Sequence, residues 1–288
     1  MKKLIYLLMS LSFVAFVACS EDKDNPVNNE NTRTENGSKG GDTGSNGDKF
    51  GNTSGDSNGN VSAVSVFKSG TENGHDYVDL GLSGTKWATC NVGATNAQDY
   101  GDYYAWGEVT TKDAYHWDTY WHGTYGYDND FSKLTKYISS DEKNTLDLSD
   151  DAAYVNWGGK WRMPTNTQWD ELINKCYWVW TENYNNSNVK GYIVYKAKSY
   201  SDKGQKIYKN ETPSSSYTLS DAHIFLPAAG YCQSILYEAG RYGWYWSSSL
   251  CTSFPSLAWC ACCNSGRVSN NGGSGDRFRG LSVRAVFK

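Results

Sequence analysis

The sequence predicts an α+β fold: one domain with two helices and short antiparallel sheets, preceded by a disordered linker. Helix signals occur at 148–155 and 165–176, whereas the later apolar segments are short and separated by glycine- and serine-rich turns. A few helices followed by many short strands are typical of this class. The 288-residue chain therefore divides into a leader at 1–19, a linker at 20–65 and a folded domain at 66–288.

The leader is typical of an export signal. Lys2 and Lys3 precede an apolar run that ends at Ala18 and is too short to cross a bilayer. The small residues before Cys19 resemble the lipobox of bacterial lipoproteins, although Phe16 stands where leucine is more usual. We expect cleavage before Cys19 and lipidation of its thiol, which would anchor the protein to a membrane. An ordinary signal peptide or an uncleaved anchor is the alternative.

The linker is predicted to be a tether. The acidic cluster at 20–24 resembles the signal that sends Bacteroidetes lipoproteins to the outer face of the outer membrane. Asn, Gly, Ser, Thr and Asp dominate from there to about residue 63, and such a chain cannot bury enough apolar surface to offset its ordering entropy. As a flexible coil it spans about 35–40 Å on average. We therefore expect a lipid-anchored domain on the cell surface.

Composition restricts the partners of the domain. The formal net charge is −4 and the sequence has no basic stripe, which argues against nucleic acid. The 12 Trp and 22 Tyr supply large amphipathic rings, which serve both cores and contact surfaces. Seven of the eight cysteines follow Cys19, so at least one of them is unpaired or pairs with another molecule.

The first elements of the domain are two strands, at 75–82 and 86–92, joined by a glycine turn. Aromatic, loop-like sequence follows up to residue 137. A short helix is then expected at 148–155, capped by Ser149 or Asp150, with Asp151 favouring its positive end. Asp147, Asp150 and Asp151 could also bind calcium, but the sequence has no complete calcium loop, so we prefer capping.

The second helix has the clearest local signals. Thr165 and Gln168 form a capping box directly after Pro164. Its apolar face consists of Trp169, Leu172, Ile173 and Cys176, which are predicted to be core. The strands expected after it are 176–180, 192–197, 224–230, 244–250, 257–263 and 281–286, and 198–221 is a polar excursion.

Seven phrases together resemble one family. They lie in order at 77–94, 100–108, 150–158, 161–165, 225–230, 245–249 and 280–284. This set, with its Trp-Arg-Met-Pro-Thr, Trp-Ser-Ser-Ser and Gly-Leu-Ser-Val-Arg phrases, resembles the Fibrobacter major paralogous domain of Bacteroidetes surface lipoproteins. That family resembles the C-type-lectin-like fold in its formylglycine-generating-enzyme branch. The resemblance runs from about residue 75 to the end, and it implies a C-type-lectin-like domain.

Two chemical functions are weighed against binding. A formylglycine-generating-like oxidoreductase needs a reactive cysteine pair, for which only Cys260, Cys262 and Cys263 are candidates, and their spacing does not match such a pair. The four histidines, His75, His116, His122 and His223, sit in no recognisable base motif. A metal or redox site at Cys251 and these three cysteines would use a Cys-x-Cys-Cys spacing that is unusual for zinc. We therefore expect neither an enzyme nor a metal or other cofactor.

A binding face is predicted within residues 251–279. Strand alternation along 257–264 predicts an inward face and an outward face. The inward residues are Leu257, Trp259, Ala261 and Cys263. The complete candidate ligand-binding set is Cys251, Ser253, Phe254, Ser256, Cys260, Cys262, Asn264, Arg267, Ser269, Asn270, Asn271, Arg279 and Trp244. The scaffold around it is expected to include Trp87, Trp157, Trp161, Arg162 and Arg284. The expected partner is a protein or glycan on another cell, a phage or a host surface.

The same segment resembles the variable region of a diversity-generating retroelement. In those systems, adenines of an Asn-rich template are randomised within a C-type-lectin-like scaffold, and the altered codons never give Lys, Glu, Gln or Met. Residues 251–280 contain none of these four. Such codons would also explain surface cysteines that have no structural purpose. The alternative is an ordinary Gly/Ser/Asn-rich loop.

Overall fold

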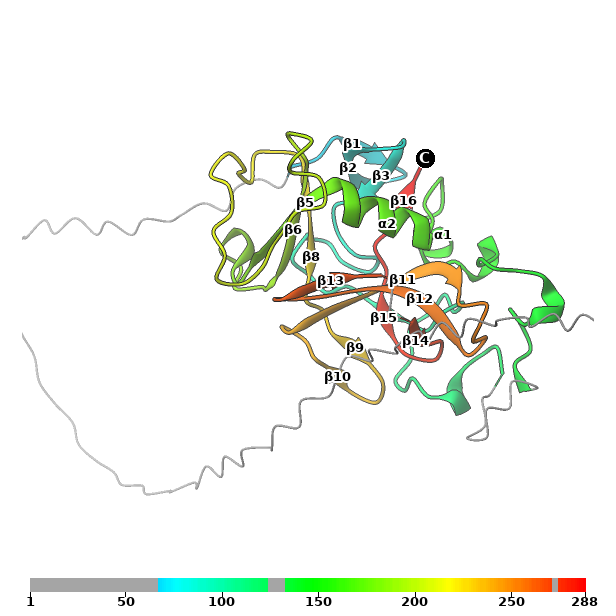
Figure 1. Cartoon of the computed structure of the whole chain (residues 1–288). Coiled ribbons are helices and arrows are strands. Elements are labelled where there is room, and N and C mark those ends of the chain that lie inside the picture. The colour runs from blue at the N-terminus through cyan, green and yellow to red at the C-terminus, as the bar shows by residue number, and fades with distance from the viewer. Residues whose placement is uncertain (1–66, 124–132, 271–273) are drawn as a thin grey trace, which may run out of the picture. The chain divides into compact units, whose positions relative to one another are not determined.

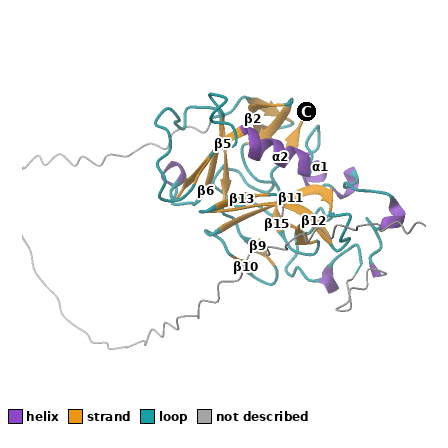
Figure 2. Cartoon of the chain, in the orientation of Figure 1, coloured by secondary structure: helices purple, strands orange, loops and turns teal. Residues whose placement is uncertain are grey.

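The computed structural model describes residues 67–123, 133–270 and 274–288. The predicted leader, Cys19 and the whole predicted linker lie outside these residues. The described chain is mostly β-sheet with two short α-helices, so the prediction of a few helices among short sheets is confirmed (Figures 1 and 2). None of the helices in this part of the chain is long and apolar enough to cross a membrane.

Four sheets make up the described fold. The first, in the order β1-β2-β3-β16, consists of β1 (Gly70–Glu72), β2 (His75–Leu82), β3 (Thr85–Ala88) and β16 (Val286–Phe287). The second, in the order β13-β12-β11-β15-β4 with β14 also on β12, consists of β4 (Tyr103–Tyr104), β11 (Tyr242–Leu250), β12 (Leu257–Asn264), β13 (Arg267–Ser269), β14 (Ser274–Asp276) and β15 (Leu281–Ser282). The third, in the order β7-β5-β6-β8, consists of β5 (Cys176–Thr181), β6 (Gly191–Lys196), β7 (Lys206–Ile207) and β8 (His223–Pro227). The fourth is the hairpin of β9 (Tyr231–Cys232) and β10 (Leu236–Tyr237).

The helices are α1 (Ala152–Trp157) and α2 (Asn166–Lys175), and short 3₁₀ turns occur at Trp117–Thr119, Ser139–Asp141, Leu148–Asp150 and Tyr184–Asn186. The sheets are not purely antiparallel as predicted, because β15 runs parallel to β11 and β7 runs parallel to β5.

Asp151 is the cap of α1. Its carboxylate accepts the backbone N–H of Tyr154 at 3.0 Å and that of Met163 at 2.9 Å, so it also ties the helix to the segment before α2. The prediction that Ser149 or Asp150 caps this helix is wrong, because both residues belong to the preceding 3₁₀ turn. Asp150 instead pairs with Lys136 and accepts the hydroxyl of Tyr137.

Burial of Asp151 makes the stability of the fold depend on pH. Desolvation raises the pKa of this carboxyl to about 6, although its backbone N–H donors lower it. A folded-state pKa above the unfolded value means that the contribution is greatest below about pH 4 and is lost as the pH rises through 6. In Asp151→Asn, which keeps a capping side chain, denaturant unfolding should lose this pH dependence. The difference in unfolding free energy between the two proteins should change by about 2 kcal/mol between pH 4 and pH 7. Parallel stability curves would contradict it.

The structure confirms the capping box and the buried apolar face predicted for α2. The side chains of Thr165 and Gln168 form the predicted capping box. Trp169, Leu172 and Cys176 are fully buried. The helix lies along β11 and β12 (Figure 1), and the indole of Trp169 donates to the carbonyl of Trp246 at 3.2 Å. The apolar face of α2 is therefore the cover of one side of this sheet.

The strand pair β11-β12 separates two apolar clusters. On one side Tyr245, Ala261 and Cys263 pack with the residues of α2, in a cluster that we call the α2 core. On the other side Trp246 and Cys260 pack with Ala152, Trp157 and Trp106, in a cluster that we call the α1 core. Because both faces of these strands are covered along much of their length, side-chain alternation alone does not divide β12 into core and surface.

Several predicted scaffold residues are buried. Trp87, Trp161 and Arg284 have no exposed surface, and Trp157 is 7% exposed. The guanidinium of Arg284 donates to Asn91 Oδ1 at 2.9 Å and to the carbonyls of Ala88 and Phe225. Arg162 is only half-buried and lies over the ring of Tyr154. The structural role predicted for Arg284 is thus that of a buried cross-link between distant segments.

Candidate ligand-binding face

The register of β11, β12 and β13 brings predicted site residues into rows across the sheet. Trp244, Cys262 and Ser269 lie opposite one another, and Tyr242, Asn264 and Arg267 form the next row. Residues directly opposite in neighbouring strands share a face of the sheet. The structure therefore gathers five predicted residues, from three segments of the sequence, on one face, and adds Tyr242 to them.

Exposure on this face increases toward the β12-β13 turn. The row of Trp246 and Cys260 has no exposed surface, because it lies in the α1 core. Cys262 in the next row is 5% exposed. Asn264 and Arg267, in the last row, are half-buried. The exposed part of this face is thus its end at the β12-β13 turn, not the whole predicted row.

Several residues predicted to contact a ligand are in fact buried. Cys260 and Cys262 do not face outward, and Cys251, Ser256 and Asn270 are also buried, each at 6% exposure or less. Conversely, Leu257 and Trp259 were predicted to be core residues from strand alternation, but both are only half-buried. Buried cysteines behave as small apolar residues. The idea that these cysteines are surface residues without a structural purpose is therefore wrong.

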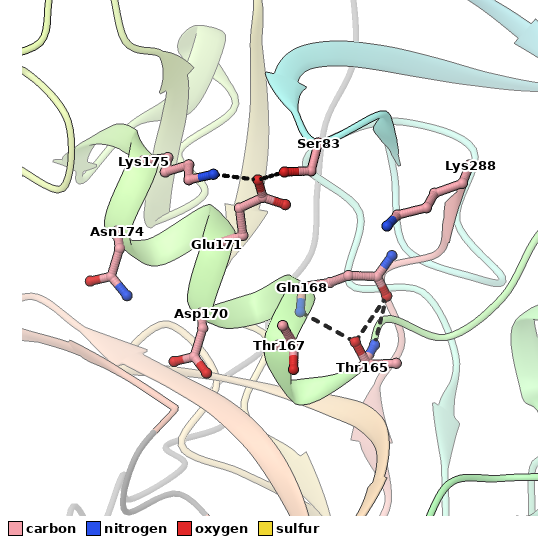
Figure 3. A pocket seen from close by; sticks show the side chains of 9 residues that line it. All are labelled: Ser83, Thr165, Thr167, Gln168, Asp170, Glu171, Asn174, Lys175 and Lys288. Carbon is pink, nitrogen blue, oxygen red and sulfur yellow. Dashed lines mark hydrogen bonds and ion pairs between the residues drawn. The ribbon is translucent and has the colours of Figure 1, made fainter.

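Asn270 has a structural role at α2. Its Nδ2 donates to the carboxylate of Asp170 at 2.8 Å and more weakly to Asn166. Asp170 lines an open groove of about 720 Å³ along α2, which Figure 3 shows together with Glu171 bonded to Lys175 and Ser83. The amide of Asn270 thus holds the end of the predicted segment against this helix and is not available to a ligand.

The remaining predicted residues lie in three places. Ser253 and Phe254 are exposed in the loop before β12, close to a pocket of about 300 Å³ that Thr252 and Pro255 line. Arg279 is half-buried, pairs with Asp276 at 3.0 Å and lies over the ring of Tyr231. Asn271 lies outside the described residues.

Aromatic rings flank the exposed end of the face. Tyr242 and Trp244 stack with their centroids 6.2 Å apart. The indole nitrogen of Trp244 is covered and has no hydrogen-bond partner among the described residues. In the fourth sheet Tyr231 stacks on Tyr237, and Gly230 bridges to Gly243 of β11. The predicted role of Trp244 as a flanking aromatic is consistent with this position.

A pocket that the sequence did not predict lies beside the exposed end of the face. It has a volume of about 330 Å³ and lies where the ends of β5 and β12 meet the start of β11. Its lining residues are Trp180, Glu182, Lys190, Lys209, Gly240, Arg241, Tyr242, Asn264, Ser265 and Gly266. Only Asn264 among them belongs to the predicted set. The other residues come from five separate segments, so no local sequence pattern predicts the pocket.

Six of the seven cysteines in the described residues are buried, and Cys232 is half-buried. Cys263 is 4% exposed, and burial raises the pKa of its thiol to about 12, which disfavours the reactive thiolate. None of the three pockets described above is lined by a cysteine. Within the described residues, no group of three or more His, Cys, Asp or Glu side chains is placed to hold a metal ion.

Comparison of the chain with protein-family models, with curated proteins and with solved structures gives no match. The function is therefore argued from the chain's own residues.

Proposed function

We propose that this protein is a lipid-anchored, cell-surface binding protein whose contact surface is the exposed end of the β11-β12-β13 face. The observation that carries the proposal is the convergence of Tyr242, Trp244, Asn264, Arg267 and Ser269 on that end. Tryptophan, tyrosine and arginine contribute most to the energy of protein contacts, and asparagine and serine add adaptable hydrogen bonds. Strands of a buried sheet hold them in place, and such a support suits recognition.

The family and anchor belong to the same proposal. A Fibrobacter-type domain with a C-type-lectin-like fold is supported by the phrases in the sequence and by two helices combined with short sheets. A lipid on Cys19 and a polar linker would hold the domain away from an outer membrane. The ligand is a protein or glycan on another surface, and neither a cofactor nor catalysis is required.

The second part of the proposal is a retroelement origin for residues 251–279, with fewer variable positions than the sequence alone predicts. The absence of Lys, Glu, Gln and Met over 251–280 supports it. Burial restricts it, because randomising Cys260 or Asn270 would disturb the fold. The positions open to variation are then Ser253, Phe254, Asn264, Arg267 and Ser269. A nearby copy of the coding segment that differs only at adenines, beside a reverse transcriptase, would support this origin, and a neighbourhood without either would exclude it.

The proposal is tested by substitution of the face after a ligand has been found on an array of glycans and surface proteins. The triple variant Asn264→Ala, Arg267→Ala and Ser269→Ala should lose about 100-fold in affinity, because a few central residues supply most of a contact's energy. The matched control, Thr167→Ala, Asn174→Ala and Lys175→Ala, changes the groove along α2 and should bind normally. Normal binding by the first variant and loss in the control would move the site to α2.

A further inference from the structure

The pocket of about 330 Å³ beside the proposed face has an excess of positive charge. Three cationic side chains, those of Lys190, Lys209 and Arg241, line it together with one carboxylate, Glu182. The chain as a whole has a formal net charge of −4. A local concentration of cations in an acidic protein favours an anionic ligand over a cationic one.

The single carboxylate is shared between the two lysines. Glu182 Oε2 lies 2.9 Å from Lys190 Nζ and 3.6 Å from Lys209 Nζ. Its other oxygen accepts the indole N–H of Trp180 at 2.5 Å. The hydrogen bonds from Trp180 and Lys190 lower the pKa of this carboxyl, so it stays ionised and positions both ammonium groups. One ammonium charge is left unbalanced at the pocket.

The rim adds further donors. Asn264 Oδ1 accepts the backbone N–H of Gly266 at 2.9 Å, which fixes the amide, and none of the described residues accepts from its Nδ2. The Arg241 side chain is 72% exposed and pairs with Glu238 at 3.3 Å. The side chains of Lys190, Lys209, Arg241 and Asn264 thus supply hydrogen-bond donors around the pocket. A carboxylate, which only accepts, complements such a rim.

The pocket lining is mainly polar, with a smaller apolar part that suits one face of a ring. Trp180, buried at 8% exposure, and Tyr242, half-buried, contribute aromatic surface. A pyranose presents hydroxyl groups around its edge and C–H groups on its faces, so it can pack on such rings while its polar edge meets the donors. An acidic peptide side chain would satisfy the cations but would leave the aromatic walls unused.

We propose that this pocket binds a carboxylate-bearing sugar residue, with Lys190 and Lys209 at the carboxylate and Trp180 and Tyr242 against the ring. The inference rests on the proposed binding function and names the ligand class for one part of its surface. Hexuronates of acidic polysaccharides and sialic acids of host glycans share this chemistry, and the experiment separates them.

The test measures binding of the full chain to four probes by calorimetry or ligand-observed NMR. The probes are methyl β-D-glucuronide, N-acetylneuraminic acid, methyl β-D-glucoside and a short Glu-rich peptide. At least one acidic sugar should bind about tenfold or more tightly than the neutral glucoside, and rising salt should weaken its binding. The preferred acid identifies the source. Equal affinity for the glucoside, no detectable acidic-sugar binding, or binding of the peptide alone would overturn the proposal.

Charge-matched variants localise the site. Lys190→Met with Lys209→Met should reduce acidic-sugar affinity to the level of the glucoside. Lys68→Met with Lys160→Met removes two surface lysines that pair with Asp76 and Glu72 and should change affinity less than twofold. Equal effects of the two double variants would exclude the pocket. If acidic sugars fail while the Asn264, Arg267 and Ser269 variant still loses its array ligand, only the pocket assignment is wrong.

Discussion

Replacing Cys260 by Asn is expected to destabilise the protein by about 2–5 kcal/mol, because the amide would be buried in the α1 core and would exceed the volume of the thiol. Cys260 has no exposed surface and lies opposite Trp246 in the sheet. The indoles around it have already used their donors: Trp246 Nε1 bonds to the carbonyl of Tyr104 and Trp106 Nε1 to that of Ser247. Chemical denaturation of the two proteins measures the difference.

Ser269→Asn is the matched control for this substitution. Ser269 lies on the same face of the sheet, one strand further out, and is half-buried. Its exchange should change the free energy of unfolding by no more than about 0.5 kcal/mol. Similar stabilities for the Cys260 and Ser269 variants would mean that Cys260 is accessible, as the sequence-based prediction of an outward side chain implied.

Replacing Arg277 by Met should cost about 3–5 kcal/mol of stability, although the residue lies within the segment predicted to bind ligand. Its guanidinium is fully buried and donates to Tyr120 Oη at 2.8 Å and to the carbonyls of Lys136 and Pro255 at 2.9 and 3.0 Å. The methionine would fill much of the space but leave these acceptors without a donor, and each unmet buried group is expensive.

The neighbouring Arg279→Met provides the comparison. Arg279 is half-buried and its partner is the surface carboxylate of Asp276, so its loss should cost about 1 kcal/mol or less. Thermal or denaturant unfolding of both variants separates the two roles. An Arg277 variant as stable as the Arg279 variant would show that the buried guanidinium does not hold these loops together.

The sequence predicts the elements better than it predicts their exposure. The strand predicted at 75–82 and the helix predicted from the capping box match the observed bounds of β2 and α2 closely. Residues 257–263, in contrast, are all apolar, which is the pattern of a strand covered on both faces. Reading that run as a two-sided strand would have kept Cys260 in the core.

The candidate site depends on tertiary pairing that no local pattern contains. Asn264 and Arg267 were predicted because they sit in a polar turn, and the structure leaves them at the accessible end of the sheet. Lys190, Lys209 and Arg241 carry no motif, and only the meeting of β5, β11 and β12 brings them to one pocket. The buried role of Arg277 could not be predicted either, since its acceptors are the Tyr120 hydroxyl and the carbonyls of Lys136 and Pro255, all more than twenty residues away.

The most direct test of the central claim is amide hydrogen exchange of the full chain with and without the ligand selected on the array. The account predicts slower exchange on binding at Tyr242–Trp244 and from Asn264 to Ser269, with little change along α2. Protection confined to α2 and the groove lined by Asp170 and Lys175, with the β12-β13 turn unaffected, would contradict it.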